Sequence, residues 1–227
     1  MPGCSSLPGS GIEGRQVAWG SSLSLVFWRR DSHHCGRSAA MEEGLVCVHE
    51  VPETLYHYYE RTRGPFVHLS DLPYPEAERI LEAIRKDGVT FAARRAPEYL
   101  AIRRGLEEQV RALFIAKGGR PIRQCPHYLT LGPCPWLLDW YRDGCELALP
   151  MAAIDSAVVS FTYGDMFPAM RLRDAKPYRG QVYRWDELPD LVARYGVPQD
   201  WNHDGSRGPE RYIEAQLWDE APVARMM

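Results

Sequence analysis

The chain has 227 residues, of which 45% are hydrophobic and 25% charged, and its formal net charge is -3. This length and composition predict one globular domain with a sizeable core. The negative balance argues against nucleic acid as a partner. The sequence also contains no apolar run near the roughly 18 residues that span a bilayer, so we expect no membrane partner.

The first forty residues differ from the rest in composition. They are rich in Gly and Ser, and residues 12–15 read Ile-Glu-Gly-Arg, a common protease-cleavage tag. The apolar patch at 23–28 precedes its charges, whereas a secretory signal peptide has its charges first. We therefore expect an N-terminal extension or cloning remnant over residues 1–40 and a single globular domain over residues 41–227.

The six cysteines bear on the redox compartment. None forms a Cys-x-x-Cys pair, and their spacing matches no zinc module. Cys125, Cys134 and Cys145 fall in one stretch with His127, so a metal site there is an alternative to small buried thiols. Buried thiols are typical of a reducing compartment, and we expect a cytoplasmic protein.

Helical patterns dominate the first half of the predicted domain. Residues 54–59 are rich in Tyr and favour a strand. Capping and glycine signals predict one helix between Ser70 and Gly88 and a second helix over 97–118. Opposite charges three or four residues apart on the second helix predict a solvated face. These charged residues are Arg103, Arg104, Glu107, Glu108 and Arg111.

Short strands predominate in the second half. A short aromatic helix or turn is expected over 135–141 and a capped helix over 186–195. Two early helices followed by scattered strands predict the α+β class, with the helices packed on a mostly antiparallel or mixed sheet. The strand candidates are residues 127–131, 146–149, 157–163, 180–185 and 211–218.

The last strand candidate carries the clearest functional pattern. Alternation places four side chains on one face, Tyr212, Glu214, Gln216 and Trp218. A carboxylate and an amide between two aromatic side chains predict a ligand-binding or catalytic surface, and a solvated strand face is the alternative. Earlier in the chain the backbone turns at Gly164, so the adjacent Asp165 is either catalytic or a turn cap.

The loop before this strand resembles the start of a calcium-binding loop. Asp200, Asn202 and Asp204 stand at every second position and are followed by a glycine, which is how a chain begins to wrap a hard cation. The twelfth position, where a bidentate Glu is needed, holds Arg211. Ca²⁺ binding and an Asx turn without metal both remain open.

Several segments resemble a family of uncharacterised bacterial proteins, and this resemblance implies no function. The resemblance covers most of the chain from Leu55 onward. The matching segments are Leu55-Tyr-His-Tyr-Tyr-Glu60, Gly64-Pro-Phe66, Leu69-Ser-Asp-Leu72, Pro126-His-Tyr128, Gly132-Pro-Cys134, Ser160-Phe-Thr-Tyr-Gly-Asp165, Phe167-Pro168 and Gly208-Pro-Glu-Arg-Tyr-Ile-Glu214.

A second resemblance is to ADP-ribosyltransferases, whose fold opens with a strand bearing Tyr-His and ends with a strand bearing Glu. The matching positions are Tyr56-His57 and Glu214, with Tyr163 between them. The resemblance implies that His57 holds the ribose of NAD, that an aromatic ring stacks on its nicotinamide, and that Glu214 stabilises the cationic centre. A cationic transition state does need a fixed carboxylate. Gln216 follows Glu214, whereas the family has Gln or Glu two positions before it.

Two functional hypotheses follow. The first is an enzyme acting on a nucleotide-like ligand, with His57 and Glu214 as catalytic residues, and with ligand contacts from Tyr56, Tyr163, Tyr212 and Gln216. The alternative is a non-enzymatic protein-interaction or ligand-binding module whose partner surface is built from Trp136, Trp140, Tyr141, Tyr212 and Trp218. Convergence of His57, Tyr163 and Glu214 in one pocket would favour the enzyme.

Overall fold

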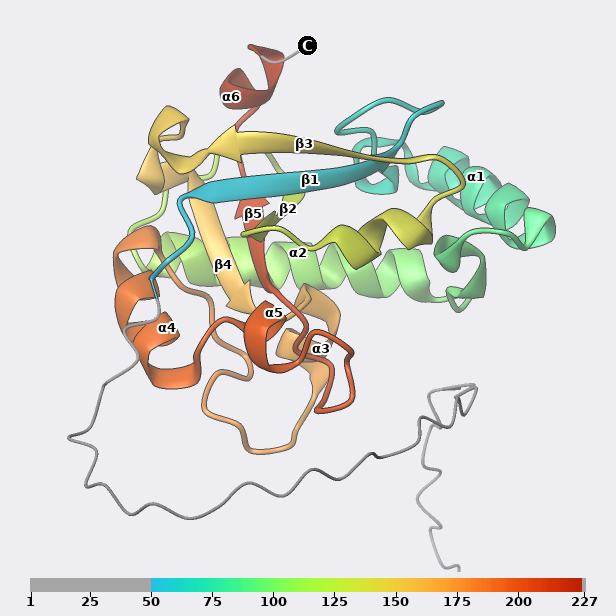
Figure 1. Cartoon of the computed structure of the whole chain (residues 1–227). Helices are drawn as coiled ribbons and strands as arrows, with labels where there is room; N and C mark the ends of the chain where they lie inside the picture. Colours follow the sequence, from blue (N-terminus) through green and yellow to red (C-terminus); the bar gives the residue numbers. More distant parts are fainter. Residues whose placement is uncertain (1–49, 226–227) are drawn as a thin grey trace, which may run out of the picture. The chain divides into compact units, whose positions relative to one another are not determined.

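A computed structural model describes residues 50–225, which belong to the unit Val46–Met227. The expected extension over residues 1–40 lies outside the described residues. The described part is α+β, and its sheet has five strands in the order β3-β1-β2-β5-β4. Every neighbouring pair in this sheet is antiparallel, which confirms the predicted class (Figure 1).

Five of the six strand candidates form strands. The strands are β1 (Thr54–Glu60), β2 (His127–Leu131), β3 (Gly144–Pro150), β4 (Val159–Tyr163) and β5 (Ile213–Leu217). The candidate at 180–185 was wrong, because only an isolated bridge joins Tyr183 to Phe161. The chain then leaves the sheet in a short turn that begins at Trp185.

Both early helices are present. The six helices of the described residues are α1 (Tyr74–Asp87), α2 (Tyr99–Ala116), α3 (Met166–Arg171), α4 (Leu188–Tyr195), α5 (Pro198–Trp201) and α6 (Ala221–Ala224). Short 3₁₀ turns are η1 (Leu69–Asp71), η2 (Phe91–Arg94), η3 (Pro135–Trp140), η4 (Met151–Ala153), η5 (Ser156–Val158) and η6 (Trp185–Glu187). α1 ends at Gly88, whose φ of 70° is unfavourable for other residues. None of the described helices is long and apolar enough to cross a membrane.

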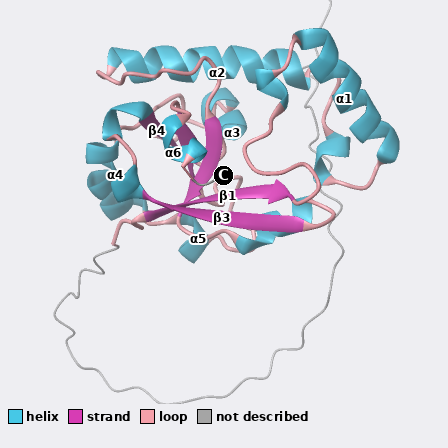
Figure 2. Cartoon of the chain, turned by 90° about the horizontal axis from the view of Figure 1, so that it is seen from above, coloured by secondary structure: helices cyan, strands magenta, loops and turns pink. Residues whose placement is uncertain are grey.

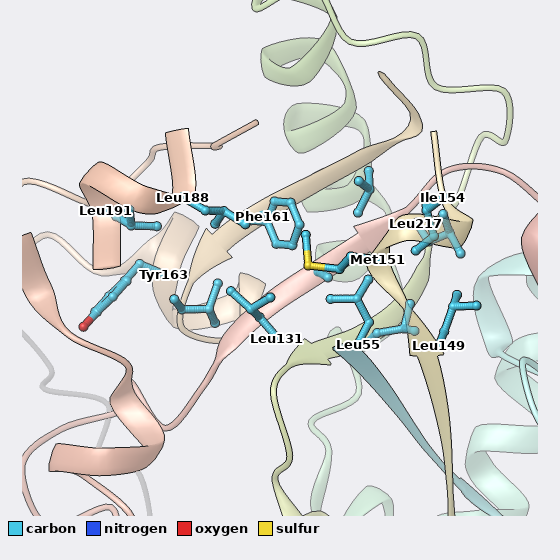
Figure 3. Close-up of a cluster of buried hydrophobic side chains, with 14 of the residues drawn as sticks. Leu55, Leu131, Leu149, Met151, Ile154, Phe161, Tyr163, Leu188, Leu191 and Leu217 are labelled. Carbon is cyan, nitrogen blue, oxygen red and sulfur yellow. The ribbon is translucent and has the colours of Figure 1, made fainter. Parts of the chain in front are cut away.

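The two faces of the sheet carry different side chains. One face is apolar and packs against α4, forming the main core seen in Figure 3. The other face packs against α2 and α3 through a second core that includes Phe114, Met170 and Trp218 (Figure 2). Strand alternation explains the division, because neighbouring residues of a strand point to opposite faces.

The pairing of β1 with β2 is short. β1 pairs with β3 over its whole length, but it pairs with β2 only through Leu55 with Leu131 and Tyr56 with Thr130. Beyond Tyr56 the two strands separate. The sheet is therefore open between β1 and β2, on the side where α1 and α2 lie.

We predict that two glycines respond in opposite ways to alanine. A Cβ at Gly144 would lie 2.5 Å from the backbone oxygen of Leu138, so Gly144→Ala should destabilise the fold by about 1–3 kcal/mol. A Cβ at Gly105 meets no atom within 4 Å, so Gly105→Ala in α2 should stabilise it by about 0.5–1 kcal/mol. Urea unfolding measures both changes, and equal midpoints for the two variants would contradict the packing of β3 against η3.

Candidate functional site

A cavity of about 760 Å³ lies where β1 and β2 separate. Its walls come from β1, β2 and β5, and from α1, α2 and the start of α3. Aromatic side chains make up much of the lining, and a small number of charged groups lie among them. A cavity of this size and lining is typical of a site for a small organic ligand.

The sheet face that reaches the cavity is polar although it is buried. Its strand residues include Tyr128, Thr130, Ser160, Thr162, Glu214 and Gln216. Hydrogen bonds satisfy most of this face. The Gln216 amide nitrogen, Nε2, donates to Thr162 and to Glu214, and the amide oxygen, Oε1, accepts from Ser160. Gln216 is fully buried and outside the cavity lining, so it positions Glu214 instead of contacting a ligand.

Glu214 is the carboxyl group that the sheet presents to the cavity. It is 5% exposed, so the alternative of a solvated strand face is wrong. Its Oε1 accepts from Gln216 Nε2 at 3.0 Å and from the Met166 N–H at 3.3 Å. Burial, and then repulsion by Asp165, raises the pKa of Glu214 well above its usual value. Burial thus favours the neutral, protonated form of Glu214 over its carboxylate.

Asp165 lines the cavity beside Glu214 and is held by different partners. It caps the N-terminus of α3, where Oδ1 accepts from the Phe167 N–H at 2.7 Å. Its Oδ2 accepts from the Tyr212 hydroxyl at 3.1 Å. The turn-cap alternative is therefore confirmed, and Asp165 also lines the cavity, while its catalytic role stays a prediction.

A buried ion pair on α2 borders the same cavity. Arg103 Nε donates to Glu107 Oε1 at 2.9 Å, and its Nη1 donates to the Tyr99 hydroxyl at 2.8 Å. Glu107 is only 1% exposed and also accepts from the hydroxyls of Ser70 and Tyr128. The predicted solvated face was therefore wrong for Arg103 and Glu107. Charge spacing alone does not reveal which side of a helix is covered by polar neighbours.

His57 is among the residues that border the cavity with Glu214, but its ring is held by structural hydrogen bonds. It follows Tyr56, which shares a face with Glu214 through Thr130, so His57 points to the opposite face. Its Nε2 accepts from the Phe66 N–H at 2.9 Å, which leaves the proton on Nδ1 for the Tyr128 carbonyl at 2.9 Å. Both ring nitrogens are occupied, so the proposed role of holding a ribose is not supported.

Tyr163 and Tyr212, the two tyrosines expected to stack on a ligand, lie in different places. Tyr163 is fully buried in the main core beside α4, with its hydroxyl bonded to the Tyr195 carbonyl (Figure 3). Its predicted place in the pocket was wrong, since it alternates with Ser160 and Thr162, which share the sheet face of Glu214, and it points to the opposite face. Tyr212 and Tyr56 do line the cavity together with Glu214.

The loop at 200–204 is organised by its own hydrogen bonds. Asn202 Oδ1 accepts from the Arg207 N–H at 2.8 Å, and its Nδ2 donates to the carbonyls of Gly208 and Glu210. Asp204 Oδ1 accepts from Ser206, and Asp200 is exposed. Within residues 50–225 no group of three His, Cys, Asp or Glu side chains could hold a metal. The structure thus favours the Asx turn, and the calcium and cysteine–histidine metal sites lack support.

The predicted aromatic partner surface is not assembled on the outside of the domain. Trp218 is fully buried and Tyr212 is 6% exposed. Tyr141 donates its hydroxyl proton to the Tyr58 carbonyl, and Trp136 packs beside Tyr212. These side chains mainly surround the cavity and the core, which weakens the interaction-module hypothesis.

Comparison with known proteins adds no relative. No family model matches the chain, and no curated protein and no solved structure matches it either. The resemblances to the bacterial family and to ADP-ribosyltransferases therefore stay predictions. The functional argument depends on the geometry of the cavity.

We predict that acid destabilises the fold through His57. Burial lowers the pKa of His57 from 6.5 to about 4. As the pH falls below 6.5 the unfolded chain binds a proton that the folded state excludes, so stability is lost between pH 6.5 and about 4. The loss from His57 alone is on the order of 3 kcal/mol.

His57→Asn provides the comparison. Asn cannot titrate in this range, so the variant should be less stable at pH 7 but should have a flatter dependence of unfolding free energy on pH. Urea unfolding at pH 7 and at pH 4.5 measures both slopes. His68 and His127, whose pKa values are also lowered by burial, are present in both proteins. Identical slopes would show that His57 does not carry a shifted pKa.

Proposed function

We propose that the domain is an enzyme that breaks or transfers a glycosidic bond of a nucleotide-like ligand by acid–base catalysis. The observation that carries this proposal is the pair formed by Glu214 and Asp165, two carboxyl groups in one cavity with different environments. Pairs of this kind supply a proton donor and a carboxylate at the same pH. The cytoplasmic location expected from the cysteines is part of the proposal.

Glu214 would be the general acid. Its Oε1 accepts two hydrogen bonds, so the carboxyl proton is placed on Oε2, for which no partner exists among the described residues. As the glycosidic bond breaks, Glu214 donates this proton to the leaving group, which departs with the bonding electron pair. This role replaces the carboxylate role that the ADP-ribosyltransferase resemblance implies for Glu214.

Asp165 would act on the carbon side of the same bond. Its two oxygens are held by the Phe167 N–H and the Tyr212 hydroxyl, which keeps the carboxylate oriented before the reaction. A negative charge there stabilises the oxocarbenium-like centre that remains. Asp165 then accepts a proton from the water or hydroxyl that attacks this centre, and proton exchange with solvent restores Glu214.

The aromatic lining fits a ligand that carries a flat ring. Tyr56, Tyr99, Tyr128 and Tyr212 border the cavity around the two carboxyl groups. Aromatic side chains bind the faces of such rings by offset stacking. Nucleoside monophosphates are the natural first substrates to test, since their base would leave as an anion unless an acid protonates it. NAD is the comparison, because nicotinamide leaves its cationic ring as a neutral molecule and needs no proton.

We predict that Glu214→Gln abolishes turnover and preserves the fold. Gln is nearly isosteric and keeps an oxygen for the Met166 N–H, but it cannot donate a carboxyl proton. The expected loss in kcat is about 10²–10⁴-fold. Chromatography of the base released from nucleoside monophosphates measures it. Release of nicotinamide from NAD is the comparison that needs no proton, and thermal unfolding of the same samples is the check on folding.

Glu53→Gln is the matched control, because Glu53 is exposed and outside the cavity lining. It should retain the turnover of the unmodified protein. Asp165→Asn should lose turnover as Glu214→Gln does. The proposal is contradicted if none of the compounds is cleaved, or if Glu214→Gln is as active as Glu53→Gln.

A further inference from the structure

Four arginines line the cavity, and three of them have an acidic partner. Arg63 pairs with Glu60, Arg103 with Glu107, and Arg142 with Asp87. The fourth, Arg95, makes no ion pair and donates no side-chain hydrogen bond within residues 50–225. A guanidinium group carries five N–H donors and is always charged near neutral pH. The N–H donors and the charge of the Arg95 guanidinium group are thus available to a ligand.

Arg95 is held in place although its charge is unpaired. Its carbonyl accepts from Arg85 Nε at 2.9 Å, which fixes the backbone after η2. Its guanidinium carbon lies 4.3 Å from the centre of the Tyr99 ring, a cation–π distance. Tyr99 is itself stacked on Phe167 at 5.0 Å with an angle of 3° between the rings. A charged group oriented in this way binds an anion with little loss of side-chain entropy.

Arg103 lies in the same part of the cavity. It shares Tyr99 with Arg95, because Arg103 Nη1 donates to the hydroxyl of the ring that Arg95 covers. Its Nε and Nη1 are used by Glu107 and Tyr99, and Nη2 has no hydrogen-bond partner among the described residues. Two guanidinium groups around one tyrosine therefore present unused N–H donors to the same cavity.

We propose that Arg95, assisted by Arg103, binds a phosphoryl group of the ligand. Arginine recognises the oxygens of a phosphate through two parallel hydrogen bonds, and the unpaired charge of Arg95 would be neutralised by the anion. This proposal rests on the proposed function and narrows it, because it makes the substrate a phosphorylated nucleotide and excludes a free nucleoside.

The test is binding of pyrophosphate and AMP to the full-length protein, measured by isothermal titration calorimetry, with adenosine and succinate as comparisons. The unmodified protein should bind AMP at least tenfold more tightly than adenosine and should bind pyrophosphate but not succinate. Arg95→Gln should weaken pyrophosphate and AMP at least tenfold and leave adenosine unchanged. Arg94→Gln is the matched control, because Arg94 is exposed and outside the cavity lining, and it should bind as the unmodified protein does.

Arg95→Lys adds a check on geometry, since it keeps the charge but loses the planar pair of donors, and it should recover only part of the affinity. Equal binding by Arg95→Gln and Arg94→Gln, or tighter binding of succinate than of pyrophosphate, would overturn the phosphate site. Assays of base release by the unmodified protein separate the two proposals. If pyrophosphate binds but no base is released, the enzyme proposal fails and the phosphate site stands. If base is released from adenosine as fast as from AMP, only the phosphate site fails.

Discussion

The short pairing between β1 and β2 is the constraint on which the site depends. A full ladder would close the sheet, but only two residue pairs join these strands. His57 bridges them beyond that point, with one ring nitrogen bonded to β2 and the other to Phe66, whose φ of 58° is unusual for a side chain of its size. Hydrogen bonds of His57 therefore hold β1 and β2 in this separated arrangement. The separation leaves the polar face of β2 and β5 open to a cavity.

That polar face gives the cavity its chemistry. Buried hydroxyl and amide groups are stable only when they are paired, and Ser160, Thr162 and Gln216 pair with one another. Glu214 stands at the end of this set, with one oxygen bonded to Gln216 and the other free to face a ligand. Asp165 belongs to a different element, because it caps the N-terminus of α3. The different environments of the two carboxyl groups follow from this arrangement, and the proposed acid–base roles follow from those environments.

Local patterns predicted the fold class, the two early helices and the alternation of β5, because glycine ends, capping residues and a period of two act over short distances. Tyr163 was misplaced because its strand register decides which face it joins, and register depends on partners far along the chain. Arg103 and Glu107 have the spacing of a solvated helix face. Contacts with Ser70, Tyr99 and Tyr128, which no helix spacing shows, surround the pair. The unpaired charge of Arg95 is a three-dimensional property that no sequence spacing records.

The central claim is that burial and the neighbouring Asp165 hold the pKa of Glu214 well above its usual value, so that Glu214 can donate a proton. A ¹³C NMR titration of the Glu214 carboxyl carbon tests this claim most directly. Glu214→Gln assigns the signal in the full-length protein labelled at glutamate. The carboxyl should titrate well above 4.5, and Asp165→Asn should lower its pKa by removing the neighbouring carboxyl group. A Glu214 carboxyl that titrates near its usual value of 4.5, and does so equally in both proteins, would contradict the claim.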